Sequence, residues 1–170
     1  MTDIKSVTVS KRKFMVFIIF FITLVIAIFG TWFYVKKYSK KYIKPSFESM
    51  SISGTVDIDN NKYGYSVMQF SEEYKVGLCG APDANNIGVD LYFTNPEENN
   101  VLLKCLLLDE SGNTIGESGV LNPGTYVKTI NFNKIIEPGN YDLTVKVLGF
   151  EPETYYSKGI VHLKTHVQVN

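Results

Sequence analysis

The chain has 170 residues, of which 45% are hydrophobic and 14% aromatic. Its 17 basic and 17 acidic side chains cancel, so the net charge gives no argument for binding nucleic acid or acidic substrates. About 120 residues remain once an N-terminal apolar segment and its flanks are set aside, which is a normal size for a single domain.

The apolar segment covers residues 14–35, FMVFIIFFITLVIAIFGTWFYV, and contains no charged side chain. As an α-helix, these 22 residues would be roughly 33 Å long, enough to cross the hydrocarbon core of a bilayer. Backbone amides find no water in lipid, so the segment is expected to be helical. Trp32 and Tyr34, near one end, are of the type that prefers the membrane interface. The sequence therefore predicts one transmembrane helix in contact with membrane lipid.

Basic side chains flank this helix on both sides, so the positive-inside rule does not orient it. The apolar run is longer than a normal signal-peptide core, and no A-x-A-like cleavage site follows it, which favours an uncleaved signal anchor. We expect residues 1–13 to form a cytoplasmic basic tail and 36–49 a basic juxtamembrane linker. Residues 50–170 would then form an extracytoplasmic domain at the plasma membrane, because a short tail is easier to leave in the cytoplasm than a folded domain.

Small residues recur along one side of the predicted helix. Thr23, Ala27 and Thr31 are four residues apart, and Gly30 lies beside them. Such a stripe lets a second helix approach closely, so self-association or packing against a partner helix is one interpretation. Small residues also occur in single membrane spans without any packing role.

From Met50 onward, apolar residues recur with a period of two, which is typical of strands with one buried face. Turn signals rich in Gly, Pro, Asn and Asp separate these runs. The predicted strands are 52–58, 63–70, 74–79, 89–94, 101–108, 126–132, 141–147 and 160–169. With no helical period after the anchor, the pattern predicts an all-β antiparallel sandwich or barrel, of which the sandwich is favoured.

The segment PGNYDLTV, residues 138–145, resembles the penultimate strand of immunoglobulin-like and fibronectin-III-like domains. In that strand a turn, here Pro138 and Gly139, precedes a tyrosine and then alternating apolar residues. The resemblance implies that the Tyr141 hydroxyl bonds to the backbone at the preceding corner. Alternatively, Tyr141 is a core aromatic residue, and a sandwich is expected in either case.

Three longer segments, VDLYFTNPEENN, LLDESGNTIGESGVLNPG and EPETYYSKG, resemble a group of small single-pass membrane-anchored proteins of Gram-positive bacteria. Some members of that group travel with conjugative or other mobile elements. The resemblance covers about half of the chain. It implies location and fold, and it carries over no catalytic residue.

Sequence signatures of catalysis are incomplete. The nearest match to a nucleophile elbow, GESGV at 116–120, departs from G-x-S-x-G and lies in a hairpin. His162 and His166 are four residues apart on a strand, about 13 Å, too far to bind one metal ion without another strand. We expect neither enzymatic activity nor a cofactor, and an unrecognised enzyme remains the alternative from a different class.

Asp57, Asp59 and Asn61 match the first ligand positions of a calcium loop. However, Lys62 replaces the required glycine and Met68 replaces the bidentate glutamate. No metal site is therefore expected, and a looser calcium-dependent site in this turn stays open as an alternative.

The two cysteines, Cys79 and Cys105, could form one disulfide in an oxidising compartment. Because Cys105 lies in the apolar run VLLKCLLL, a small buried hydrophobic residue is the other interpretation.

With catalysis and metal binding set aside, the function that remains is binding of a partner. We expect the binding surface on loops at one end of the sandwich. The first candidate is the connection 149–159, whose candidate residues are Phe150, Glu151, Glu153, Tyr155 and Tyr156. Tyrosines provide large contact areas at low entropic cost, although these two could instead pack back onto the sandwich.

The second candidate is the turn 95–100, in which Glu97 and Glu98 are expected to be exposed; an ordinary solvated hairpin is the alternative. Together, these features predict a non-enzymatic, membrane-anchored binding or scaffold protein of the cell envelope with a protein partner. An accessory subunit of a conjugation or secretion apparatus is the main alternative.

Overall fold

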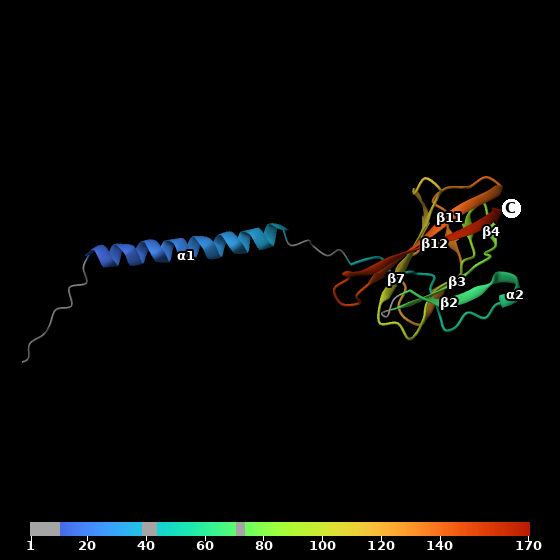
Figure 1. Cartoon of the computed structure of the whole chain (residues 1–170), viewed down its shortest axis with the longest axis horizontal. Coiled ribbons are helices and arrows are strands. Elements are labelled where there is room, and N and C mark those ends of the chain that lie inside the picture. Colours follow the sequence, from blue (N-terminus) through green and yellow to red (C-terminus); the bar gives the residue numbers. More distant parts are fainter. Residues whose placement is uncertain (1–10, 39–43, 71–73) are drawn as a thin grey trace, which may run out of the picture. The chain divides into compact units, whose positions relative to one another are not determined.

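The computed structural model describes residues 11–38, 44–70 and 74–170, which belong to two compact units (Figure 1). The first unit contains a single helix, and the second contains all of the strands. Residues 1–10 of the expected tail and 39–43 of the expected linker lie outside the described residues.

The first unit is helix α1 (Lys11–Tyr38), which is 28 residues long. Its stretch Lys13–Tyr34 is long and apolar enough, by length and composition, to cross a membrane, and none of it is buried in protein. The predicted segment 14–35 coincides with this stretch to within one residue at each end. Among the described residues, the helix continues past Val35 as far as Tyr38.

The second unit is built from two β-sheets. The five-stranded sheet has the order β1 (Ile52–Ser53), β9 (Thr125–Val127), β6 (Phe93–Asn95), β3 (Lys75–Cys79) and β2 (Tyr65–Gln69). The seven-stranded sheet has the order β10 (Ile130–Asn131), β5 (Gly88–Val89), β4 (Ala84–Asn85), β12 (Ser157–Val169), β11 (Gly139–Phe150), β7 (Leu102–Leu108) and β8 (Thr114–Glu117).

The sheets are arranged like a sandwich around one hydrophobic core. The predicted period of two is confirmed most clearly on β11, where Leu143, Val145 and Val147 are buried and the residues between them are half-buried. Pairing between the named strands is antiparallel except that Val169 of β12 pairs in parallel with Ala84 of β4. A bridge between Gly116 and Phe132 links the two ends of the seven-stranded sheet, so that this sheet curls.

Two predicted strands are each divided between the sheets. The run 89–94 separates into β5 and β6, and the run 126–132 separates into β9 and β10. Both runs cross at the same place, where the Tyr92 amide donates to the Lys128 carbonyl at 2.9 Å. Tyr92 has φ 49°, a left-handed conformation that ends a strand. Because both sheets bury alternate residues, the period of two does not reveal where a strand changes sheet.

The prediction for 52–63 is wrong in two respects. Only Ile52 and Ser53 are in a strand, and a four-residue helix, α2 (Asn60–Tyr63), follows where no helix was expected. The Asp59 carboxylate accepts a hydrogen bond from the Asn61 amide and so caps this helix. Gly64 closes it in a left-handed conformation, φ 58°.

The expected bond of Tyr141 is present. Its hydroxyl donates to the Glu137 carbonyl at 2.9 Å, across the corner formed by Pro138 and Gly139. Tyr141 is half-buried and also packs against the core, so the alternative interpretation of this side chain holds as well.

Candidate functional site

The first predicted site is the hairpin loop between β11 and β12. It is closed by its own backbone: the Glu151 amide donates to the Tyr156 carbonyl, and the Tyr155 amide donates to the Glu151 carbonyl, both at 2.9 Å. Thr154 adds a side-chain hydrogen bond to the Glu151 carboxylate. The loop is therefore a compact unit in which Glu153 is exposed.

The two tyrosines of this loop differ in exposure. Tyr156 is 54% exposed, whereas Tyr155 is half-buried and has φ 57°. A left-handed tyrosine is uncommon and costs conformational energy. The expected contact surface is thus provided mainly by Tyr156, with Phe150 half-buried at the end of β11.

The second predicted site is the turn between β6 and β7. Glu97 and Glu98 are both exposed, as expected. Glu98 forms an ion pair with Lys75 of β3 at 3.0 Å. A backbone hydrogen bond, followed by the bond from Lys75, lowers the pKa of the Glu98 carboxyl. The turn is therefore tied to β3 and is not a freely solvated hairpin.

The strand register brings the two predicted sites to the same end of the sandwich. Phe150, the last residue of β11, pairs with Leu102, the first residue of β7. Leu102 follows the 95–100 turn directly in the chain. This proximity depends on long-range pairing, and no local pattern in the sequence could reveal it.

Two buried amide side chains hold the turn in place. Asn95 Nδ2 donates to the carbonyls of Val101 and Leu121, at 2.8 and 3.0 Å. Asn99 Nδ2 donates to Asn95 Oδ1 and to the Lys75 carbonyl, both at 2.7 Å, and Asn99 Oδ1 accepts from the Lys75 amide at 2.8 Å. Asn95 is fully buried and Asn99 is 7% exposed.

These asparagines were read from the sequence only as turn residues. Asparagine is common in turns because its short amide bonds to nearby backbone, and the same amide can bond to distant backbone when it is buried. Local sequence offered no signal that would distinguish the two roles.

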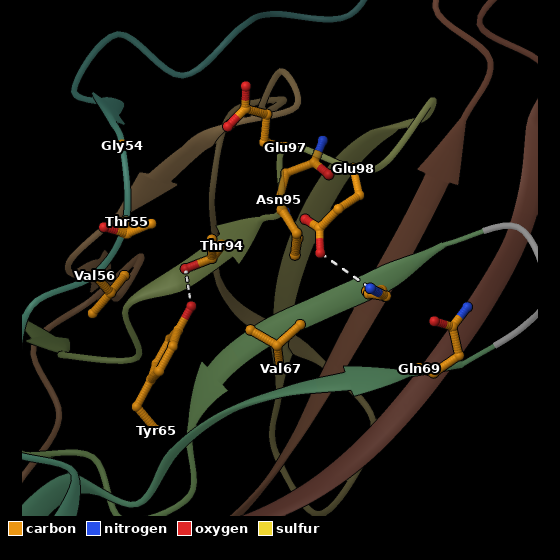
Figure 2. Close-up of a pocket in the computed structure, with 13 residues that line it drawn as sticks. Gly54, Thr55, Val56, Tyr65, Val67, Gln69, Thr94, Asn95, Glu97 and Glu98 are labelled. Carbon is orange, nitrogen blue, oxygen red and sulfur yellow. Dashed lines mark hydrogen bonds and ion pairs between the residues drawn. The ribbon is translucent and has the colours of Figure 1, made fainter.

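A groove of about 510 Å³ opens beside the turn, on the outer face of the five-stranded sheet (Figure 2). Its floor comes from β2, β3 and β6, and the segment 54–56 forms one wall. Glu97 and Glu98 line it at the turn, and Tyr65 and Val67 line it on the side of β2. The groove thus combines an apolar floor with carboxylates at its rim.

Tyr65 crosses the floor to reach another strand. Its hydroxyl donates to Thr94 Oγ1 of β6 at 2.9 Å, and Thr94 donates to the Tyr92 carbonyl at 2.8 Å (Figure 2). The ring passes over Gly77 of β3, where an added Cβ would collide with the Tyr65 hydroxyl oxygen. Burial raises the pKa of the Tyr65 hydroxyl. Sequence reasoning missed this contact, because the predicted strand 74–79 gave no role to Gly77.

On α1, the hydroxyls of the small-residue stripe are satisfied within the helix. Thr23 donates to the Phe20 carbonyl at 2.8 Å, and Thr31 donates to the Ala27 carbonyl at 2.6 Å. A shallow hollow lies against Ala27 and Thr31, and nothing occupies the space where a Gly30 side chain would point. Close approach of another helix is sterically possible here.

Neither cysteine forms a disulfide, and both thiols are fully buried. Burial raises the pKa of Cys79 to about 11 and that of Cys105 to about 12. Neither thiol is therefore activated as a nucleophile near neutral pH.

Within ranges 11–38, 44–70 and 74–170, no three His, Cys, Asp or Glu side chains are grouped so as to hold a metal ion. His166 Nδ1 instead lies 2.8 Å from Asp142 Oδ1 on the outer face of the seven-stranded sheet. Asp59, considered above as a calcium ligand, caps α2.

Comparison with known proteins identifies no relative: no protein-family model, no curated protein and no solved structure matches this chain.

Proposed function

We propose that this chain is a single-pass plasma-membrane protein whose β unit faces the outside of the cell and binds a protein partner, without enzymatic activity. The observation that carries the proposal is an exposed apolar helix joined to a separate β unit with two loops and a groove at one end. The anchor would confine the β unit to the membrane surface and raise its effective concentration toward neighbouring envelope proteins.

The β unit is proposed to be immunoglobulin-like or fibronectin-III-like. Strands β3, β6 and β9 lie side by side in one sheet, and β8, β7, β11 and β12 lie side by side in the other. The connection from β6 to β7 changes sheet, and β11 carries the corner tyrosine. These features support the proposed fold class, in which the other short strands would be additions at the edges.

The location outside the cytoplasm is supported by the shortness of the tail, which is easier to leave in the cytoplasm than a folded unit, and by the length of the apolar run, which favours an uncleaved anchor. The resemblance of three segments to membrane-anchored proteins of Gram-positive bacteria supports the same placement. The binding surface is proposed to comprise Tyr156 in the β11–β12 loop and the groove beside Glu97, because rigid elements hold both.

A second candidate is an accessory subunit of a conjugation or secretion apparatus. The hollow at Ala27 and Thr31 favours it, because a partner helix could pack there. Replacing Ala27 and Gly30 by leucine would fill this side of α1. Loss of a membrane complex in that variant would support this candidate, and an unchanged complex would remove it.

The proposed function is tested by crosslinking in the native host, followed by recovery of the tagged full-length chain. We expect a defined set of envelope proteins with the natural sequence, and loss of that set when Tyr155 and Tyr156 are both changed to Ser. Ile135→Ser is the matched control, because Ile135 is 73% exposed and precedes the opposite end of β11. Recovery of the chain alone, or equal loss with the control, would contradict the proposal.

A further inference from the structure

The outer face of the seven-stranded sheet carries an unusual set of side chains on β7, β11 and β12. Strand register aligns them in rows: Lys104, Leu148 and Ile160 lie in one row, and Leu106 and Lys146 lie in the next. Lys164 lies in the third row, where it pairs with Thr144. We call these six residues the lysine-leucine face.

The side chains of this face point away from the core. The residues next to Leu148 on β11, Val147 and Gly149, are buried, whereas Leu148 is only half-buried. Ile160 is 52% exposed. Both the aliphatic and the lysine side chains of this face are therefore accessible to solvent.

The charge of this face is opposite to that of the unit that carries it. Residues 45–170 contain eight lysines, no arginine and sixteen acidic side chains. The remaining positions of β7, β11 and β12 in the three rows are Leu108, Thr144 and His162, so the carboxylates of this face lie at its borders, Glu117 of β8 beside Leu106 and Asp142 in the row after Thr144. Lys104 is paired at the border with Glu117 at 3.0 Å, and among the described residues Lys146 and Lys164 form no ion pair.

We propose that the lysine-leucine face docks on the anionic lipid surface of the membrane that α1 spans. Lysines near anionic headgroups are favourable, and aliphatic side chains between them can enter the headgroup boundary. A protein partner is a poorer fit, because protein interfaces are enriched in Arg, Tyr and Trp and depleted in Lys. None of the three enriched types occurs in these rows.

The chain itself brings the face to the bilayer. Only residues 39–43 separate the end of α1 from Lys44, a reach of about 20 Å when fully extended. A net acidic unit held so close to an anionic surface is repelled unless it presents the lysine-bearing rows of β7, β11 and β12. Docking through this side would leave the groove, on the other sheet, directed away from the lipid. The inference rests on the proposed membrane anchor and is independent of the protein partner.

The test uses the full-length chain in nanodiscs, with an environment-sensitive fluorophore on His162→Cys or, as a reference on the other sheet, on Val67→Cys. The natural cysteines are buried and do not compete for the label. Discs of phosphatidylcholine alone are compared with discs containing phosphatidylglycerol, at low and high salt. We expect the label at 162 to shift to a lipid-like environment only with phosphatidylglycerol at low salt, and the label at 67 to remain in water.

Charge variants then separate docking from a local effect of the label. Each lysine contributes about a fivefold preference for an anionic surface, so Lys146→Gln with Lys164→Gln should lower the docked-to-free ratio about 25-fold. Lys62→Gln with Lys128→Gln removes the same charge from outside this face, in α2 and in the β9–β10 connection, and should leave the ratio unchanged. An identical signal at 162 in both kinds of disc, an equal response at 67, or equal effects of the two variants would overturn the proposal. Thermal unfolding of each variant verifies that it is folded.

Discussion

The two sheets of the β unit are built differently. The seven-stranded sheet is dominated by the long hairpin β11–β12, which pairs over twelve positions. The five-stranded sheet consists of short strands connected by polar side chains, namely Tyr65 with Thr94 and Asn95 with Asn99. Its outer face is hollowed into the groove.

This difference indicates how each face could act. A long regular hairpin displays side chains in rows, which suits contact with a broad surface such as lipid. Short strands do not define a concave surface by pairing alone, so buried amides and a tyrosine fix their positions. The groove should consequently be sensitive to single polar substitutions, whereas the outer face of the seven-stranded sheet should tolerate them.

The largest expected effect is that of Asn95→Ala. It leaves the Val101 and Leu121 carbonyls without their donor in a buried site and should lower the free energy of unfolding by about 3–4 kcal/mol. Urea denaturation measures this. Asn140→Ala on β11, where the side chain is exposed, is the matched control and should cost little. Equal losses of unfolding free energy in the two variants would show that the five-stranded sheet does not depend on its buried amides more than the seven-stranded sheet depends on exposed ones.

Gly77→Ala should cost about 2 kcal/mol, because the new methyl group would displace the Tyr65 hydroxyl from Thr94. The collision is mainly with the hydroxyl oxygen, so the same substitution should cost less in a Tyr65→Phe background. A double-mutant cycle of unfolding free energies gives this coupling. Additive effects would mean that Tyr65 and Gly77 do not constrain each other.

The sequence anticipated the seven-stranded sheet better than the five-stranded sheet. Strands β7, β11 and β12 have uninterrupted apolar periods, and the Tyr141 corner bond was predicted from its turn. The groove was not predicted, because it depends on where the chain changes sheet near Tyr92 and on asparagines that look like turn residues. Glu97 and Glu98 were found only because the turn itself was visible.

At alkaline pH the free energy of unfolding should fall because Cys105 is buried as a neutral thiol. Its pKa is raised to about 12 in the folded protein from an ordinary value of 9, so above about pH 9 only the unfolded chain loses this proton. Stability from this group is complete below pH 9 and declines as pH rises toward 12. Between pH 9 and 11 the wild type should lose on the order of 2 kcal/mol relative to Cys105→Ala. If the free energy of unfolding depended on pH in the same way in the two proteins, a buried neutral thiol would be contradicted.

The smallest expected effect is a gain on the seven-stranded sheet. Thr165 Oγ1 is a buried side-chain oxygen without a partner among the described residues. Thr165→Val removes the unsatisfied hydroxyl at nearly constant shape and should stabilise the protein by about 1 kcal/mol. Thermal unfolding detects this as a higher Tm. A lower Tm would indicate that the hydroxyl has a partner in solution.

The most direct test of the central claim is the accessibility of single cysteines in intact cells to a membrane-impermeant maleimide. Cys79 and Cys105 are buried and provide a silent background. We expect Ser111→Cys, exposed in the turn between β7 and β8, to be labelled in intact cells, and Ser6→Cys in the basic tail to be labelled only after permeabilisation. The reverse pattern, or a chain that leaves the membrane fraction, would contradict an anchored β unit outside the cytoplasm.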